Sequence, residues 1–371
     1  MVQPSSRLDS PAVPRRVLIL RPGALGDIIR TLPAIRCLRV QFPESRLEWA
    51  VYDSWKDLLI GHPDLDEILV VSRHQRGPGR EKKTVPPPLT LGKLIREIRI
   101  RRYDLTLDFQ GTLRSGLLAR LSGCTRRYGF SRRYSREGNF LFNNHRVRLS
   151  SPQLHRVDKN LTLVRAVGAR SPAGDIHLSI GKAAEETARR WLGDLDGTGR
   201  RVILLVPGTS LRQTYKRWPP VHYARLAHLL HLRGEFPVIA WGPGEADLAS
   251  QICEESAGAA HVLPASSIPE MAAVMLRSSC VVAGDTGPAH LASALGIPLV
   301  AIFGGTDPRL NAPRGRHIQI LDGSTRPAGR RYRKRHGARF LASLLPETVA
   351  AAVADLLTKA EPNAEPRPNP D

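Results

Sequence analysis

The sequence predicts an α/β protein made of two doubly wound domains. Each half of the chain opens with a short apolar run, Arg16–Leu20 or Arg201–Val206, followed by a Pro-Gly turn and a helical pattern. In Val281–Pro308, two apolar runs flank a Gly/Thr turn and a helix of small residues. Strand, turn, helix and strand in this order are typical of βαβ units. We therefore expect two Rossmann-like parallel sheets that face each other across a cleft, with ligands at the carboxyl ends of their strands.

Further apolar runs and helical patterns complete this alternation. The additional strands are expected at Leu47–Val51, Glu67–Val71, Leu105–Asp108, Pro237–Trp241, His261–Leu263, Cys280–Ala283 and Leu299–Phe303. Apolar residues at helical spacing predict helices from Ile28 to Leu38, over Glu185–Leu192, over Met271–Leu276 and over His290–Leu295. Ser267 and Glu270 have the spacing of a capping box at the start of the third of these helices.

The chain of 371 residues is long enough for two domains. A Gly/Pro-rich stretch around Val167–Asp175 marks the boundary, which gives domains over 15–174 and 175–345 and a C-terminal helix over 346–360. The polar, proline-containing ends, 1–14 and 361–371, are expected to be disordered.

Hydrophobic content and cysteine usage indicate the compartment in which the protein works. The chain is 42% hydrophobic, yet none of its apolar runs approaches the ~20 residues of a membrane span, and its N-terminus lacks an apolar signal segment. Its four cysteines form no metal-spaced pair, which is typical of ordinary thiols in a reducing compartment. We therefore expect a cytoplasmic protein.

The net charge of +21 calls for a polyanionic neighbour. Nucleic acid, anionic lipid and a phosphorylated substrate all fit, as do arginines that merely cover solvated faces. The basic runs are Arg73–Lys83, Arg96–Arg102, Arg126–Arg136 and Arg330–Arg339. Few aromatic residues interleave with them, so a base-stacking platform has weak support. Charge alone does not choose the partner.

Polar residues at the predicted turns form the candidate site. Asp285 and His290 flank the Gly/Thr turn of the βαβ unit, whose N–H groups suit an anion. Thr209, Ser210, Lys216 and Arg217 follow the first strand of the second half, and hydroxyls with cations are what a diphosphate needs. Glu245 could accept hydrogen bonds from ribose hydroxyls or lie in a plain turn.

In the first half, Asp27 comes soon after the first strand. It fits either a helix N-cap or a general base that takes a proton from an attacking hydroxyl, and position alone does not separate the two. Gln110 lies in the turn after Asp108 and could line the site of an acceptor.

Several known motifs are missing. The sequence has no Walker A loop, G-x-G-x-x-G, G-x-S-x-G or HExxH. Two D-x-D pairs, Asp64 with Asp66 and Asp194 with Asp196, lie in segments that read as surface, so we expect no metal site. Lys216 and helix-terminal N–H groups would then shield the diphosphate.

Four segments, RVLILRPGALGDIIRTLPAI, LDFQGTLRSGLLARL, KRWP and GDTGPAHLASALGIPLVAIFGGTDP, resemble the lipopolysaccharide heptosyltransferases of glycosyltransferase family 9. The similarity runs from about Arg15 to Leu357 and implies a GT-B fold with an acceptor-binding and a donor-binding domain. It implies a metal-independent, inverting transfer. The usual donor is ADP-L-glycero-D-manno-heptose and the usual acceptor is the Kdo or heptose end of an inner-core lipid A. Where many members have a cysteine-containing segment, this chain has Arg330–Arg339.

The resemblance also implies roles for single residues. Asp27 matches the proposed catalytic base and Lys216 the lysine that contacts the diphosphate. Residues matching the donor site are Thr209, Ser210, Glu245, Asp285, Thr286, Gly287 and His290. Residues that fit an anionic acceptor are Gln110, Arg73, Arg76, Arg80 and Lys82. Such an acceptor is made at the inner leaflet of the cytoplasmic membrane, so we expect peripheral association there and no nucleic acid.

Three alternatives remain open at this stage. A nucleotide-sugar epimerase of the same architecture would turn over the donor without an acceptor. A family-9 transferase could use another sugar. A non-catalytic binder of nucleic acid or membrane would depend steeply on salt and be indifferent to Asp27 and Asp285.

Overall fold

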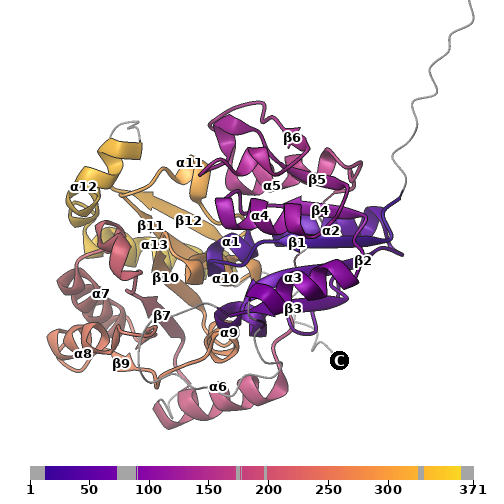
Figure 1. Cartoon of the computed structure of the whole chain (residues 1–371). Helices are drawn as coiled ribbons and strands as arrows, with labels where there is room; N and C mark the ends of the chain where they lie inside the picture. Colours follow the sequence, from indigo (N-terminus) through magenta and orange to yellow (C-terminus); the bar gives the residue numbers. More distant parts are fainter. Residues whose placement is uncertain are drawn as a thin grey trace, which may run out of the picture. The chain divides into compact units, whose positions relative to one another are not determined.

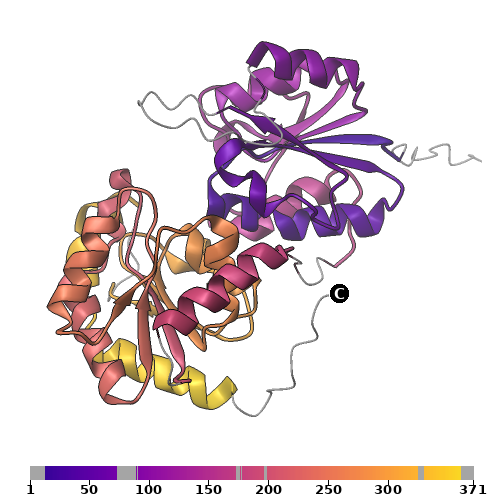
Figure 2. The same cartoon turned by 90° about the horizontal axis from the view of Figure 1, so that it is seen from below.

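The computed structural model describes residues 13–72, 89, 91–172, 176, 178–195, 199–324 and 330–360. These residues fall into two compact units, Met1–Ile176 and His177–Asp371. Each unit has its own parallel sheet, with helices on both of its faces (Figures 1 and 2). The α/β fold predicted from the alternating pattern is confirmed, whereas the cleft between the halves stays a prediction.

The first unit is built on a six-stranded sheet in the order β3-β2-β1-β4-β5-β6. Its strands are β1 (Arg16–Leu20), β2 (Arg46–Tyr52), β3 (Glu67–Val71), β4 (Leu105–Asp108), β5 (Arg126–Phe130) and β6 (His145–Val147). Its α-helices are α1 (Leu25–Ile29), α2 (Leu32–Gln41), α3 (Leu91–Ile100), α4 (Leu113–Leu121) and α5 (Arg156–Arg165). Short 3₁₀ turns are η1 (Asp53–Leu58), η2 (Arg132–Tyr134) and η3 (Asn139–Leu141).

The second unit has a six-stranded sheet in the order β12-β11-β10-β7-β8-β9. Its strands are β7 (Val202–Val206), β8 (Phe236–Ile239), β9 (His261–Val262), β10 (Cys280–Gly284), β11 (Leu299–Phe303) and β12 (Ile318–Asp322). Its helices are α6 (Lys182–Leu195), η4 (Leu211–Lys216), α7 (Pro220–Leu232), α8 (Ala246–Glu255), α9 (Ile268–Leu276), α10 (Gly287–Ala294), α11 (Pro308–Asn311), α12 (Arg330–Ala342) and α13 (Pro346–Ala360).

The two sheets have the same strand order. In each unit the first strand lies at the centre, the next two strands follow on one side, and the last three lie on the other side. The order in which strands are added to the sheet therefore reverses between β1 and β4, and again between β7 and β10, although both pairs are parallel. Such switch points leave a crevice at the carboxyl ends of the strands, where α/β proteins bind ligands.

Apolar side chains explain why these strands are central. Every residue of β10 and β11 is buried, as expected for parallel strands with helices on both faces. Helix α13 packs its Val349 and Val353 into the same core, against α7 and the sheet. Burial on this scale fixes the strand ends, and therefore the turns that follow them.

The expected strands and the capping box are confirmed, with shifts of one or two residues at some ends. The Ser267 side chain accepts from the N–H of Glu270, and Glu270 accepts in return from Ser267. Three strands were missed: β5, β6 and β12. They lie toward the sheet edges, carry polar residues and are only partly buried, so their sequences lack the apolar signal.

Candidate active site

A buried ion pair lies at the carboxyl end of β10. The Lys216 Nζ is 2.7 Å from the Asp285 Oδ2 and 3.4 Å from the Asp285 carbonyl oxygen. Asp285 directly follows β10, and Lys216 ends η4, the turn after β7. The Thr306 hydroxyl also donates to the Asp285 Oδ2, at 2.6 Å. The structure therefore brings together the two predicted residues and adds a third that the sequence did not indicate.

The charge state of this pair follows from its surroundings. Burial raises the pKa of the Asp285 carboxyl, but Lys216, the Thr306 hydroxyl and His290 together hold that pKa below its ordinary value. Asp285 is therefore ionised at neutral pH. The Lys216 ammonium has three N–H donors, and two acceptor atoms of Asp285 lie within reach, so one donor remains for another group.

A second carboxylate, that of Glu245 at the N-cap of α8, reaches the turn after β7. The Glu245 Oε2 accepts from the N–H of Gly242 at 2.9 Å, and its carboxylate also accepts from the N–H of Thr209. A Cβ on Gly208 would lie 1.8 Å from that oxygen, so a larger residue there would displace the Glu245 carboxylate. Burial raises the pKa of Glu245. Glu245 is thus tied to the predicted diphosphate turn.

The other residues predicted for the donor site lie in the turn after β7 and at the start of α10. Within the described residues, the buried Thr209 hydroxyl finds no hydrogen-bond partner, whereas Ser210 is exposed. Thr286 is the N-cap of α10, Gly287 is its first residue and His290 is buried in its first turn. The Thr286 N–H already donates to the Gly284 carbonyl at 2.7 Å. Of the Thr286–Gly287 pair, Gly287 is then the better N–H donor for an anion.

Asp27 lies at the switch point of the first unit. It is the third residue of α1, whose N-cap is Ala24, so the interpretation of Asp27 as an N-cap is wrong. Its carboxylate pairs with Arg30 at 2.9 Å and with Arg21 at 3.2 Å. The side chain is still 35% exposed, which leaves it accessible to a substrate hydroxyl. The two arginines fix its orientation.

Arg21 connects Asp27 to the predicted acceptor turn. Its Nη1 donates to the Phe109 carbonyl, one residue before Gln110. The buried Asp108 carboxylate holds the turn by accepting from the N–H groups of Gln110 and Gly111, both at 3.0 Å. The Gln110 Oε1 is buried and has no partner among the described residues. Asp27 and Gln110 therefore belong to one constellation.

More cations surround Asp27 than the sequence indicated. Arg156 and Lys159 lie close enough to Arg136, Arg21 and Asp27 for their charges to interact. Burial, with Arg156, Arg21 and Arg136 nearby, lowers the pKa of Lys159 to about 7. Arg136 ends the basic run Arg126–Arg136, but only tertiary structure brings it close to Arg156, Lys159 and Asp27. The predicted acceptor residues Arg73, Arg76, Arg80 and Lys82 lie outside the described residues.

The first D-x-D pair has a structural role. Asp64 is buried and pairs with Arg36 at 2.7 Å, contrary to the expectation of a surface segment, and Asp66 pairs with Arg39 at 2.6 Å. In the second pair, Asp194 lies in α6 and Asp196 is outside the described residues. Over the described ranges, no group of three or more His, Cys, Asp or Glu side chains could hold a metal ion.

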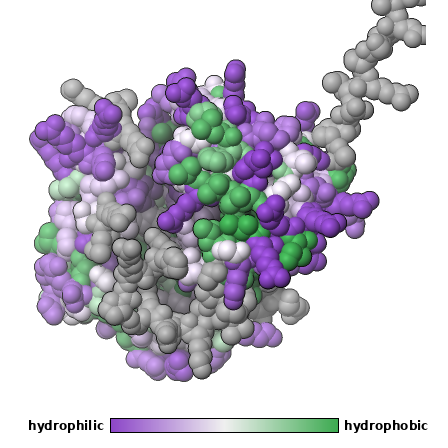
Figure 3. All heavy atoms as spheres, in the orientation of Figure 1, coloured by the Kyte–Doolittle hydropathy of each residue, from purple (hydrophilic) through white to green (hydrophobic). Residues whose placement is uncertain are grey.

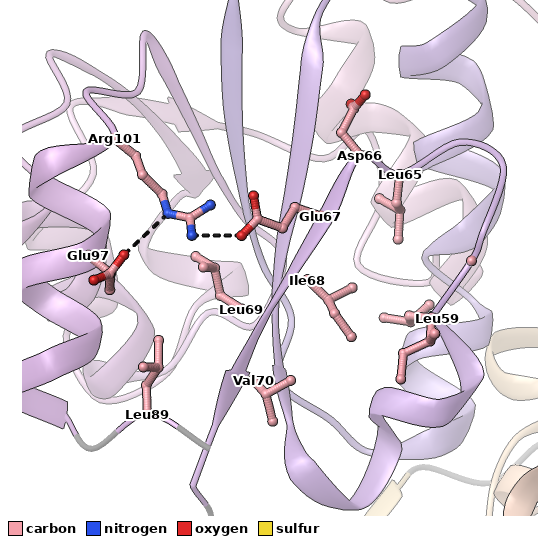
Figure 4. A pocket seen from close by; sticks show the side chains of 12 residues that line it. Leu59, Leu65, Asp66, Glu67, Ile68, Leu69, Val70, Leu89, Glu97 and Arg101 are labelled. Carbon is pink, nitrogen blue, oxygen red and sulfur yellow. Dashed lines mark ion pairs between the residues drawn. The ribbon is translucent and has the colours of Figure 1, made fainter. Parts of the chain in front are cut away.

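A cavity of about 510 Å³ lies elsewhere in the first unit, beside the edge strand β3 (Figure 4). Leu59, Ile68 and Leu69 line it, and Arg101 bridges Glu67 and Glu97 at its rim, at 2.6 and 3.7 Å. It includes none of the predicted site residues. The candidate site therefore rests on the strand ends.

No single helix in the described part of the chain is long and apolar enough to cross a membrane. Helices α12 and α13 reach that length and composition only as a pair, with an 84° bend between them.

Sequence comparisons identify the family. The family model described as glycosyltransferase family 9 (heptosyltransferase) matches residues 91–338. Lipopolysaccharide heptosyltransferase 1 of Pseudomonas aeruginosa is 30% identical over 316 residues, which cover 84% of each chain. Lipopolysaccharide heptosyltransferase 3 of Escherichia coli is 25% identical over 342 residues, covering 90% of this chain and 96% of the relative.

Solved structures have the same fold. E. coli ADP-heptose LPS heptosyltransferase II aligns with a TM-score of 0.73 at 19% identity, covering 93% of this chain and 99% of that one. E. coli heptosyltransferase WaaC, solved with ADP and also with ADP-2-deoxy-2-fluoro heptose, gives TM-scores of 0.69 and 0.67 at 23% identity, covering 92% of this chain and 99% of that one. The two six-stranded parallel units of this chain are thus those of a GT-B glycosyltransferase. The chain belongs to glycosyltransferase family 9, the lipopolysaccharide heptosyltransferases.

Proposed function

We propose that this chain transfers heptose from ADP-L-glycero-D-manno-heptose to the Kdo or heptose end of the lipopolysaccharide inner core, with inversion at the anomeric carbon and without a metal ion. The arrangement at the ends of β7 and β10 carries the proposal. There, Lys216 pairs with Asp285 at 2.7 Å, and the Thr209 hydroxyl lacks a partner within the described residues. A diphosphate needs such cations and donors, and sugar hydroxyls need carboxylates. The ligands of the E. coli WaaC structures also support an ADP-sugar donor.

The proposed step is a single displacement. The Asp27 carboxylate takes the proton of an acceptor hydroxyl, whose oxygen bonds to the anomeric carbon on the face opposite the diphosphate. The bond from that carbon to the phosphate oxygen breaks, and its electron pair leaves with ADP. Charge develops on the departing diphosphate, where the free donor of Lys216 and the N–H of Gly287 would stabilise it. Lys216 thereby supplies the positive charge that a divalent cation supplies in other transferases.

We expect ADP release from ADP-heptose in the presence of EDTA, and only when a Kdo-bearing lipid A is present. The measurement is a coupled ADP assay, with the same protein lacking acceptor as control. Release without acceptor would indicate an epimerase or hydrolase instead. No release with any lipid A acceptor, but protection by a different nucleotide sugar, would keep the fold and assign another glycan.

We further propose that the first unit meets the anionic membrane through α4 and η3. Leu113 and Leu117 on α4 and Leu141 in η3 are exposed, and the two elements are in contact. Figure 3 shows hydrophobic residues gathered over this unit and bordered by hydrophilic ones. Exposed arginines accompany the leucines: Arg114, Arg120, Arg132 and Arg133. Apolar residues beside cations suit the interface of an anionic bilayer.

Replacing Leu117 and Leu141 with serine should weaken binding to phosphatidylglycerol vesicles by about tenfold or more, because each buried leucine contributes ~1.5–3 kcal/mol. Vesicle co-sedimentation measures this. The matched control replaces Val221 and Leu232 on α7 of the second unit, which are more exposed than Leu117 and Leu141 respectively, and it should leave binding unchanged. Equal losses from both pairs, or equal binding to phosphatidylcholine, would contradict the assignment of this surface.

A further inference from the structure

One arginine of the basic run Arg330–Arg339 is not on the surface. Arg333, on α12, is only 4% exposed. Its Nη1 donates to the Thr306 carbonyl at 2.7 Å, and its Nη1 and Nη2 bind the Asp322 carboxylate at 3.1 and 2.9 Å. Asp322 ends β12, and Thr306 lies in the loop between β11 and α11. Arg333 therefore joins the end of the edge strand to the main chain of that loop.

The same face of α12 packs against η4 and against the loop between β11 and α11. Arg333, Gly337 and Leu341 are four residues apart and so lie on one side of the helix. A Cβ on Gly337 would lie 2.5 Å from the Tyr215 carbonyl oxygen and 2.7 Å from the Gly305 Cα. Backbone contact this close holds the helix against the residue before Lys216 and the residue before Thr306.

These contacts lead directly to the buried ion pair. The main chain of Thr306 is held by Arg333, and its hydroxyl donates to the Asp285 Oδ2 at 2.6 Å. The same oxygen accepts from Lys216 at 2.7 Å. Two hydrogen bonds and one ion pair thus connect Arg333, through Thr306 and Asp285, to Lys216.

We propose that Arg333 is a positioning residue for the diphosphate of the donor, acting through Thr306 to set the geometry of Asp285 and Lys216. This rests on the proposed function, in which Lys216 and Asp285 bind the ADP-sugar. Arg333 itself does not touch the ligand, because its guanidinium is buried and bound to Asp322 and Thr306. Without it, the loop loses its anchor, the Thr306 hydroxyl turns away from Asp285, and the carboxylate that pairs with Lys216 loses the hydroxyl that orients it.

The test is a double-mutant cycle read by ADP affinity. Isothermal titration with ADP should show that Thr306→Val and Arg333→Met each weaken binding about tenfold, the effect of losing one hydrogen bond to a charged group. The double variant should bind no more weakly than the weaker single variant, because both remove the same link. Arg333→Lys, which keeps one charged donor, should recover part of the affinity. The KM for the donor should rise in parallel.

Two variants separate positioning from folding. Asp322→Asn removes the ion pair of Arg333 but leaves its donation to Thr306, so it should lower the melting temperature and keep ADP affinity. Arg331→Met removes an exposed arginine of the same helix and should change neither. If Arg333→Met lowered only the melting temperature, or if the two losses of affinity multiplied in the double variant, the inference would be overturned. Should Arg333→Met fail to fold, the cycle with Arg333→Lys decides in the same way.

The proposed function fails in a different manner. A wild-type chain that binds no ADP would contradict the donor assignment as a whole, and the role of Arg333 with it. A wild-type chain that binds ADP, with unchanged affinity in the Arg333 and Thr306 variants, would overturn the positioning role alone.

Discussion

Asp27→Asn is expected to lower kcat by about 10³-fold, within the ~10²–10⁴-fold range of general-base catalysis, with little change in ADP affinity. The variant keeps the size of the side chain but removes the proton acceptor. Arg21 and Arg30 hold the carboxylate at 3.2 and 2.9 Å, so its orientation is fixed before an acceptor binds. The donor residues belong to the other unit, with its own core. Steady-state kinetics and ADP titration measure the two effects separately.

Asp57→Asn provides the matched control for this prediction. Asp57 is a more exposed carboxylate of the same unit, in η1, and should tolerate the change without loss of kcat. Near-native turnover by Asp27→Asn would rule out Asp27 as the base. A loss of ADP affinity equal to the loss of kcat would instead give Asp27 a role in binding.

Lys216→Met should affect both donor binding and stability. The substitution leaves the Asp285 carboxylate buried without its cation, and breaking a buried pair in this way costs ~3–5 kcal/mol. It also removes the cation that is proposed to stabilise the diphosphate, so both ADP affinity and kcat should fall. Thermal unfolding and ADP titration are the measurements.

A charge-balanced double variant distinguishes the two causes. Lys216→Met combined with Asp285→Asn removes both charges, so it should regain much of the lost stability but none of the ADP affinity. Recovery of both would mean that Lys216 acts only as a structural partner of Asp285. Unchanged activity of Lys216→Met alone would contradict its place in the donor site.

The sequence predicted best where burial and local turns decide the structure. Fully apolar strands such as β10 and β11 could be placed almost to the residue, because parallel strands with helices on both faces need continuous apolar runs. Asp285 follows β10 directly, Thr209 lies in the turn after β7, and Asp27 lies in the short helix after β1, so their place near the carboxyl ends could be predicted too. Their order along the chain was enough to identify the candidate site.

The sequence did not reveal partners that tertiary structure brings from far away. Thr306 is 21 residues after Asp285 in the sequence, and Arg333, which binds Thr306, is another 27 residues further along the chain. No periodicity links such residues. The charge pattern misled for the same reason, since arginines in the basic runs are used inside the fold: Arg101 pairs with the buried Glu48 at 2.6 Å, and Arg333 pairs with Asp322.

The repeated strand order has a consequence for how such an enzyme can diversify. Each sheet is complete within its own unit, and no strand pairing in the described residues joins one sheet to the other. Recombination between two related genes at the boundary of the two units would therefore divide neither sheet and neither hydrophobic core. Under the proposed function, a lineage can exchange the half that selects the acceptor while inheriting the half that reads the nucleotide sugar. New glycans then become accessible by shuffling intact modules, without point-by-point redesign of either pocket.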